Sequence, residues 1–320
     1  MFAMEAEIKG LIEQVDNFII GYANSREKLI NEAVADLVKA GGKRLRPILM
    51  ILASKFGDYQ SDKVTKIASG LELLHMATLV HDDIIDEGTM RRGELTVQKR
   101  FGKDVAVFVG DFLLTKSYNL FFEYLSRNSI LKFNKTVKLI CEGEAGQYQS
   151  KFDHDLSING YLRHIRRKTA LLFGFSTYVG AYESGLRNNN LFNLYNVGLE
   201  MGMSFQIRDD ILDFIGEKEK VGKAIGQDLL AGVYTLPIVY LLQSNEAGVQ
   251  VREILGKEFI TQDDIFLISE LIRKGQALDK SRQLEQRFLD RAKYHLKQLP
   301  ENEAKQSLSY ILGYQLNRKN

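Results

Sequence analysis

The chain of 320 residues is 45% hydrophobic and 26% charged, which supports a well-buried core and excludes a disordered protein. Lysine and arginine outnumber aspartate and glutamate by only 43 to 41, so the charge gives no indication of a nucleic-acid partner. The single cysteine, Cys141, excludes a disulfide framework, and we expect it to be a buried, inert thiol in a reducing compartment.

The apolar pattern predicts an all-α protein. The sequence has three prolines and few alternating runs, and residues 195–214 repeat apolar positions such as Val197 and Met201 at helical spacing. No linker or short repeat divides the chain, so we expect a single domain over residues 1–320. No apolar run reaches about 18 residues and no signal-peptide pattern is present, which predicts a cytoplasmic protein without a transmembrane segment.

The first unusual segment is an acidic cluster at the end of an apolar helix. Asp82, Asp83 and Asp86 follow the run "ELLHMATLVH", and a loop over residues 87–96 then supplies Arg91 and Arg92. Carboxylates one turn apart share a helix face and repel one another, and a helix C-terminus disfavours anions. A bound cation would remove both penalties.

A second cluster repeats this spacing. Asp209, Asp210 and Asp213 form "DDILD", and a long loop over residues 216–234 follows. An all-oxygen ligand set of this kind favours Mg²⁺, which binds a few carboxylates and completes its shell with water and phosphate oxygens. The two clusters together therefore predict several Mg²⁺ ions around one polyphosphate.

A polyphosphate also needs direct cationic partners. Arginine offers a planar fork to phosphate oxygens and lysine a point charge, so a mixture suits more than one diphosphate. The candidates lie beside glycines or directly after an acidic cluster: Lys43, Arg44, Arg46, Arg91, Arg92, Lys168 and Lys223.

These motifs, in this order, carry a family resemblance. The set "GGKRLRP", "ELLHMATLVHDDIIDEGTMRRG", "RRKTA", "FQIRDDILD" and "GKAIGQDL…TLP" resembles the trans-isoprenyl diphosphate synthases, or polyprenyl synthetases, from about residue 40 to about residue 240. The segments "KFGDY", "YLRHIRRKTALL" and "DLLAGVYTLP" are most similar to the catalytic subunits of bacterial heptaprenyl and hexaprenyl diphosphate synthases. The resemblance implies an isoprenoid-synthase-type helical bundle around a central cavity.

The resemblance also implies roles for single residues. All six aspartates would bind Mg²⁺ and bridge it to an allylic diphosphate, which Arg91, Lys168 and Lys223 would contact directly. Isopentenyl diphosphate would be held by Lys43, Arg46, His75 and Arg92, and the reacting carbons would lie against Thr169 and Gln206. One departure is that Gly232 is followed by Val233, where the family commonly has a lysine. A partner subunit or weaker diphosphate binding would follow from this loss.

The implied reaction is ionisation of an allylic diphosphate such as farnesyl diphosphate, attack by isopentenyl diphosphate, and loss of a proton. A terpene cyclase on the same fold is an alternative, although it would not need "GGKRLRP" for a second diphosphate. A di-iron bundle, suggested by Glu72 and His75, lacks the second Glu-x-x-H motif that such proteins require. A non-catalytic binding subunit would have no reason to keep both acidic clusters.

Product length and assembly complete the expectations. Ala77 and Thr78 lie about one turn before Asp82, where a growing chain anchored at the diphosphate must pass. Because both side chains are small, we expect a product of about C30 to C40, with a short-chain product of C15 to C20 as the alternative. Bulky residues near the tunnel floor would be Tyr118, Phe121 or Phe122. The resemblance implies a homodimer, or a heteromer with a small non-catalytic subunit.

Overall fold

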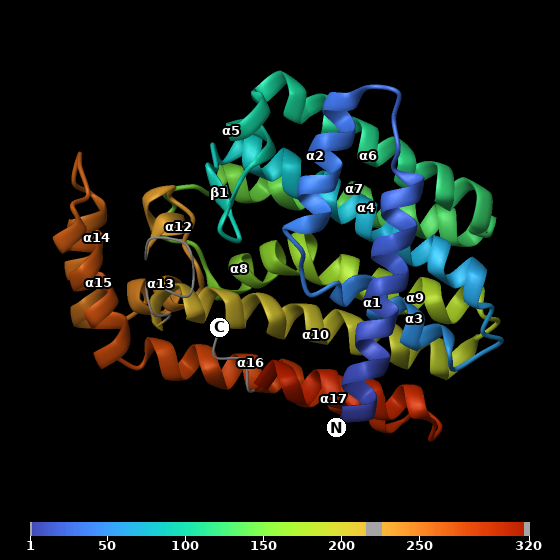
Figure 1. The fold of residues 1–320 in the computed structure, drawn as a ribbon. Helices are drawn as coiled ribbons and strands as arrows, with labels where there is room; N and C mark the ends of the chain where they lie inside the picture. The colour runs from blue at the N-terminus through green and yellow to red at the C-terminus, as the bar shows by residue number, and fades with distance from the viewer. Residues whose placement is uncertain (1, 216–225, 317–320) are drawn as a thin grey trace. The chain divides into compact units, whose positions relative to one another are not determined.

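The computed structural model describes residues 2–215 and 226–316, and it confirms the all-α prediction (Figure 1). The first half of the chain contains α1 (Phe2–Tyr22), α2 (Lys28–Lys39), α3 (Leu45–Ser54), α4 (Ser61–Ile85), β1 (Met90–Arg91), β2 (Glu94–Leu95), α5 (Val97–Phe101), α6 (Lys103–Tyr124) and α7 (Arg127–Gln149). The second half contains α8 (Ile158–Ile165), a π-helical turn η1 (Arg166–Ala170), α9 (Leu171–Glu183), α10 (Asn188–Ile215), α12 (Gln227–Leu230), α13 (Leu236–Leu242), α14 (Asn245–Leu255), α15 (Gln262–Lys274), α16 (Ala277–Lys297) and α17 (Glu303–Leu316).

The chain divides into two compact units. Unit 1 comprises residues 1–133, 175–195 and 299–310, and unit 2 comprises residues 134–174, 196–298 and 311–320. Unit 1 therefore contains the first acidic cluster and unit 2 contains the second. The expectation of a single domain over residues 1–320 stays a prediction.

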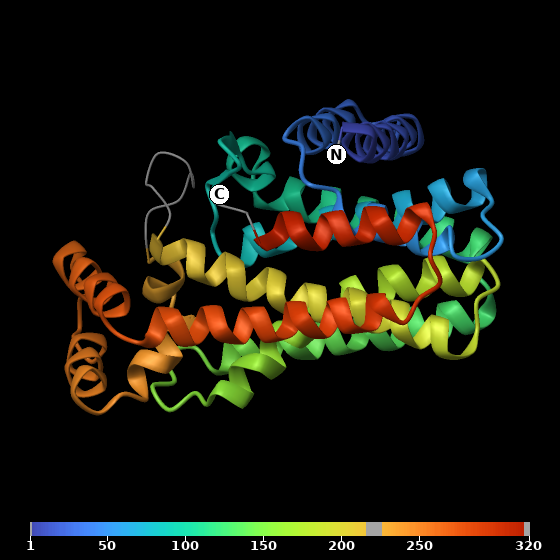
Figure 2. The ribbon, with the colours of Figure 1, turned by 90° about the horizontal axis from the view of Figure 1, so that it is seen from below.

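Helix α4 is the centre of unit 1, because α1, α3, α5 and α6 all pack against it. The approach of α6 to α4 depends on a glycine: a Cβ atom at Gly110 would lie 2.2 Å from Nε2 of His81. Figure 2 shows α1 and α2 side by side in the same unit. The C-terminal end of α4, which carries the acidic cluster, is thus held by packing along most of the helix.

A buried arginine links α1 to α4. Arg44 is 4% exposed, and its guanidinium pairs with Asp16 at 2.8 Å and with Glu72 at 2.9 Å. Removing one partner of a buried pair leaves an uncompensated charge, so the residue is tied to the fold. Of the candidate phosphate ligands in "GGKRLRP", Arg44 is therefore committed to internal partners. Glu72, half of the Glu-x-x-H pattern, is committed with it.

In unit 2, α16 runs antiparallel to α10 (Figures 1 and 2). Arg208 Nε lies 2.8 Å from Glu285 Oε1, and further along the pair Arg291 Nη1 lies 3.7 Å from Glu200 Oε2. Helix α8 begins at the Ser157 cap, whose hydroxyl accepts a hydrogen bond from Gly160 N at 3.0 Å. The π-helical turn then joins α8 to α9, and such turns are often found at functional sites.

One expectation about a side chain changes. Cys141 lies on α7 and is exposed, so the prediction of a buried thiol is wrong: at this position the helix faces solvent. Among the described helices, α6 is long and apolar enough to cross a membrane by length and composition, and 39% of its most apolar window is buried. Since α6 packs along α4, part of this apolar surface belongs to the core of unit 1.

Candidate functional site

A short hairpin after α4 positions the first acidic cluster. Strands β1 and β2 pair Arg91 with Glu94, and the turn between them uses positive φ values of 54° at Arg92 and 82° at Gly93. Positive φ at both central residues is typical of the tight hairpin turn, for which glycine is well suited. The hairpin is anchored by the Thr96 hydroxyl, which donates to the Gly88 carbonyl at 2.6 Å.

The hairpin brings Arg91 onto Asp83. The guanidinium donates through Nη2 to Asp83 Oδ1 at 2.7 Å and through Nε to both carboxylate oxygens at 3.0 Å. Asp83 is 7% exposed, whereas Asp82 is half-buried and Asp86, the residue that caps α4, is exposed. One carboxylate of the cluster is therefore paired internally, and the other two reach solvent.

A second cationic group lies in the same unit around His75. Arg46 Nη1 donates to His75 Nε2 at 3.0 Å, and Arg92 donates to the carbonyl of Gly41 in the loop that precedes α3. Lys43 lies in that loop as well. Burial lowers the pKa of His75 well below its usual 6.5, and the positive charges of Arg46 and Arg92 lower it further. The neutral imidazole of His75 thus accepts a hydrogen bond from Arg46, and positive charge is concentrated around His75.

This arrangement predicts a pH effect on stability. Between its lowered folded pKa and 6.5, His75 binds more protons in the unfolded chain than in the folded chain, so the free energy of unfolding falls as the pH drops below about 6.5. His75→Gln keeps an acceptor for Arg46 but cannot be protonated. When the pH is lowered from 7.5 to 5.5, we expect the urea midpoint of this variant to fall less than that of the wild type. An equal fall in both proteins would contradict the lowered pKa of His75.

In unit 2 the second cluster contains a buried hydrogen-bond chain. Thr169 Oγ1 donates to Gln206 Oε1 at 2.7 Å, Gln206 Nε2 donates to Asp210 Oδ1 at 2.9 Å, and Tyr161 Oη donates to Asp210 Oδ2 at 2.6 Å. Burial raises the pKa of Asp210 to about 7, although the two hydrogen bonds favour its charged form. Asp209 and Asp213 are half-buried. As in the first cluster, the second aspartate is more enclosed than its neighbours, although Oδ2 of Asp213 is also buried.

The π-helical turn carries the next two predicted residues. Thr169 lies at 6% exposure beside Gln206, and Lys168 Nζ donates to Glu144 Oε2 at 2.9 Å and to Gln147 Oε1 at 3.1 Å. Lys223 lies outside the described residues. Val233 follows Gly232, whose φ is 75°, in a turn where the Val233 amide donates to the Asp228 carbonyl. No cationic side chain stands at that position.

The sequence did not indicate every partner in these networks. Tyr161, Glu144 and Gln147 are ordinary residues of amphipathic helices, and no motif marks them. Tyr161 precedes Thr169 by eight residues, so only the folded arrangement of α8 and α10 shows that its hydroxyl contacts Asp210. The pairing of Arg91 with Asp83 had only a weak signal, which is the position of Arg91 in a glycine-containing loop directly after the acidic cluster.

Ala77 and Thr78, the residues predicted to border the product, lie on α4 within unit 1. Ala77 is fully buried, and Thr78 Oγ1 donates to the His75 carbonyl at 2.8 Å. Of the suggested floor residues, Phe121 is 1% exposed and packs against Phe133 with ring centroids 4.7 Å apart. Phe122 is 66% exposed, so its proposed place at a tunnel floor is wrong: the helix turns this ring outward.

The donor set fits a hard divalent cation. Every candidate ligand is a carboxylate oxygen, and each cluster has two carboxylates that are half-buried or exposed. Among the described residues no three His, Cys, Asp or Glu side chains stand close enough to hold an ion by themselves. Mg²⁺ typically uses one or two carboxylates and completes its octahedron with water and phosphate oxygens, which matches this arrangement.

Comparisons with known proteins identify the family. A family model described as polyprenyl synthetase matches residues 27–272. The chain is 40% identical to heptaprenyl diphosphate synthase component 2 of Geobacillus stearothermophilus over 89% of this chain and 88% of that protein. Its fold matches the heptaprenyl diphosphate synthase of Staphylococcus aureus with a TM-score of 0.94 and 33% identity, covering 98% and 99% of the two chains.

A third match has ligands in its crystal structure. The polyprenyl synthase of Caulobacter crescentus, complexed with calcium and isoprenyl diphosphate, has a TM-score of 0.93 and 31% identity, covering 99% of this chain and 97% of that one. The fold, the family model and the level of identity agree. The chain therefore belongs to the polyprenyl synthetase family of trans-prenyltransferases.

Proposed function

We propose that the protein condenses an allylic diphosphate, such as farnesyl diphosphate, with isopentenyl diphosphate to make a polyprenyl diphosphate. The observation that carries this proposal is the duplicated cluster: in each Asp-Asp-x-x-Asp segment the second aspartate is buried and held by hydrogen bonds, and the first and third are half-buried or exposed. Aspartates in this arrangement suit Mg²⁺ ions that also bind a diphosphate. The Caulobacter crescentus relative is complexed with calcium and isoprenyl diphosphate, which supports a divalent cation and this substrate class.

Roles for the aspartates follow from their surroundings. Asp82 and Asp86 in unit 1, and Asp209 and Asp213 in unit 2, would hold Mg²⁺ through their carboxylate oxygens. Asp83 and Asp210 were also predicted as ligands, but their contacts suit them to fixing the two helix segments. When bound, Mg²⁺ supplies Lewis-acid stabilisation of the departing diphosphate.

The chain's own residues would act on both substrates. Lys168, Arg91 and Lys223 would contact the allylic diphosphate and stabilise the charge that grows on it as the carbon–oxygen bond breaks. Lys43, Arg46 and Arg92, with the neutral His75, would hold isopentenyl diphosphate so that its double bond attacks the allylic carbon. Thr169 and Gln206, which are hydrogen-bonded to each other, would line the reacting carbons. The released diphosphate would take the proton, so no nucleophilic side chain is needed.

Replacing Tyr161 by Phe should weaken metal binding. The change removes the donor to Asp210 Oδ2 and keeps the ring. Asp210 would fix the segment that carries the proposed ligand Asp209, and loss of a hydrogen bond that positions a metal site typically costs about 10-fold to 100-fold in metal affinity or activity. We expect the Mg²⁺ concentration for half-maximal rate to rise about tenfold. Thermal protection by Mg²⁺ with pyrophosphate should weaken in parallel.

The control for this variant is Tyr294→Phe, which removes an exposed phenol from α16. Its Mg²⁺ dependence should match the wild type. An unchanged dependence in Tyr161→Phe would remove Tyr161 from the positioning of the second cluster.

The reaction class can be tested by stoichiometry. Purified protein with farnesyl diphosphate, isopentenyl diphosphate and Mg²⁺ should release one pyrophosphate for each isopentenyl diphosphate consumed, and EDTA should stop both. A cyclase would release pyrophosphate from the allylic substrate alone. Pyrophosphate release without isopentenyl diphosphate would therefore replace the synthase proposal with the cyclase alternative.

Product length and assembly are proposed on the same basis. The buried Ala77 supports a long chain, and the relatives include heptaprenyl diphosphate synthase component 2 and octaprenyl diphosphate synthase, so we propose about C30 to C40. The word "component" in a relative's name supports a heteromer with a small second subunit, and a homodimer is the form proposed for the chain alone. Sedimentation of the purified chain, with and without a second component, distinguishes these forms. A cytoplasmic location is part of the proposal.

A further inference from the structure

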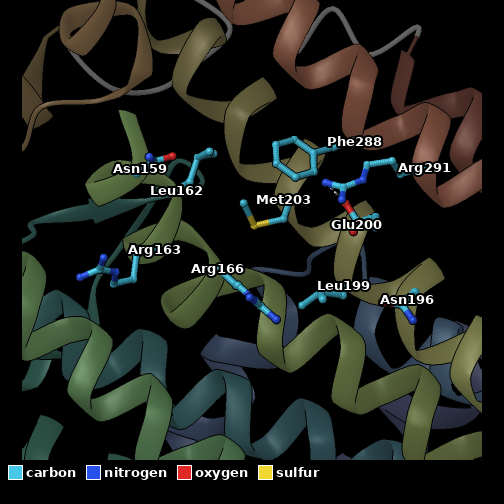
Figure 3. Close-up of a pocket in the computed structure, with 10 residues that line it drawn as sticks. All are labelled: Asn159, Leu162, Arg163, Arg166, Asn196, Leu199, Glu200, Met203, Phe288 and Arg291. Carbon is cyan, nitrogen blue, oxygen red and sulfur yellow. Dashed lines mark ion pairs between the residues drawn. The ribbon is translucent and has the colours of Figure 1, made fainter. Parts of the chain in front are cut away.

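Four elements of unit 2, namely α8, the π-helical turn, α10 and α16, line an open cavity of about 460 Å³ (Figure 3). Its described lining includes none of the proposed catalytic residues. On α10, the lining residues Asn196, Leu199, Glu200 and Met203 follow the spacing of one helix face. The volume lies within the range of about 300 to 1,000 Å³ that is usual for small-molecule sites.

The inner wall of the cavity is apolar. Leu199 and Met203 come from α10 and Phe288 from α16, and all three are less than 10% exposed. Figure 3 places Met203 and Phe288 near the middle of the site, with Leu162 of α8 beside them. This wall suits an aliphatic chain, because burying such a chain removes apolar surface from water.

The rim has an excess of positive charge. Arg163, Arg166 and Arg291 line the cavity, and the single acidic side chain among its described residues is Glu200. In Figure 3 Glu200 lies beside Arg291, and a dashed line joins the two side chains. The positive charges of Arg291 and Arg166, from two different elements, both act on Glu200 at the edge of the apolar wall, and planar forks of this kind favour phosphate and carboxylate groups.

Glu200 is the unusual group of this site. It is 8% exposed, its Oε2 atom lies 3.7 Å from Arg291 Nη1, and that oxygen accepts no hydrogen bond from the described residues. A buried oxygen without a donor destabilises the fold. Burial also raises the pKa of Glu200, which favours a shared proton with a bound group.

We propose that this cavity binds an aliphatic phosphate, with its chain on Leu199, Met203 and Phe288 and its head group between Arg166, Arg291 and Glu200. A phosphate head has three terminal oxygens, so two can accept from the guanidiniums while the third shares a proton with Glu200. A carboxylate has two oxygens, and both would be used by the arginines. The site is separate from the aspartate clusters and does not require Mg²⁺.

Titration calorimetry with decyl phosphate, in EDTA, tests the proposal. We expect saturable binding to one site per chain. Replacing both Arg166 and Arg291 by Glu should weaken binding at least tenfold, because charge-assisted hydrogen bonds are lost and repulsion is added. Arg287→Glu, which changes an exposed arginine of α16 outside the cavity lining, should bind as the wild type does.

Three further measurements make the test specific. Decanoate should bind about tenfold more weakly than decyl phosphate, and equal affinity would contradict the phosphate assignment. Inorganic phosphate should bind far more weakly, since it lacks the chain. If Arg46→Glu abolishes binding of decyl phosphate while the double variant retains it, the ligand binds the cationic group of unit 1 and the proposal is wrong. Should the double variant lose its helical circular dichroism, Arg291→Gln replaces it with the same expected direction.

Discussion

Replacing Asp82 or Asp209 by Ala should lower the rate of condensation by several orders of magnitude. Each change removes a proposed Mg²⁺ ligand from one of the two carboxylate pairs, and metal-supplied stabilisation of the leaving diphosphate accounts for much of the expected catalysis. Both side chains are half-buried carboxylates near helix ends and not part of the apolar core, so the helical circular dichroism should be retained. The measurement is kcat at saturating Mg²⁺ for each purified variant.

The matched control is Asp62→Ala, which removes an exposed carboxylate from the first turn of the same helix, α4. Asp62 pairs with Lys66 at 2.7 Å, and surface pairs of this kind contribute about 0 to 1 kcal/mol. Its activity should therefore be unchanged. Full activity in both Asp82→Ala and Asp209→Ala would refute the metal assignment for the two clusters.

Replacing Ala77 by Tyr should shorten the main product from about C30–C40 to about C15–C20. Ala77 is fully buried on α4, about one turn before Asp82, and close-packed interiors have little room for a new ring. The ring should block the path of the growing chain while leaving the carboxylates in place. Mass spectrometry of the products, with Mg²⁺ dependence recorded in parallel, measures both effects.

A graded series controls for general disruption of the fold. Ala77→Ser, which changes volume little, should keep the long product, and Ala77→Phe should act as Tyr does. Overpacking typically lowers the free energy of unfolding by about 1 to 3 kcal/mol. The melting temperature of each variant is therefore measured together with its product length. A folded Ala77→Tyr variant that still makes the long product would remove Ala77 from the tunnel wall.

The helical architecture was predictable because it depends on local pattern. Scarce prolines and three- and four-residue apolar spacing indicate helices wherever they occur, and the end of α4 at the first acidic cluster follows from the same pattern. The short hairpin after α4 was predicted only as a loop. Its two strands have two residues each, too few for an alternating pattern to show.

The site was predictable in its residue types and less so in its internal contacts. Spacing places Asp82, Asp83 and Asp86 near one another on a helix end, but it does not show which carboxylate folds inward. That choice depends on Arg91 and Tyr161, which reach Asp83 and Asp210 from other elements. Exposure was equally hard to predict for Cys141 and Phe122, because a side chain's surroundings depend on tertiary packing rather than on its own helix.

The most direct test of the central claim is the mass spectrum of the product. The purified chain, alone and with a second component, is incubated with farnesyl diphosphate, isopentenyl diphosphate and Mg²⁺. The lipid products are then dephosphorylated, and their masses are measured by mass spectrometry. Our account predicts a series of all-trans products that grows by five-carbon units and ends at about C30 to C40. Failure to extend farnesyl diphosphate under both conditions, or formation of a cyclic hydrocarbon instead, would contradict it.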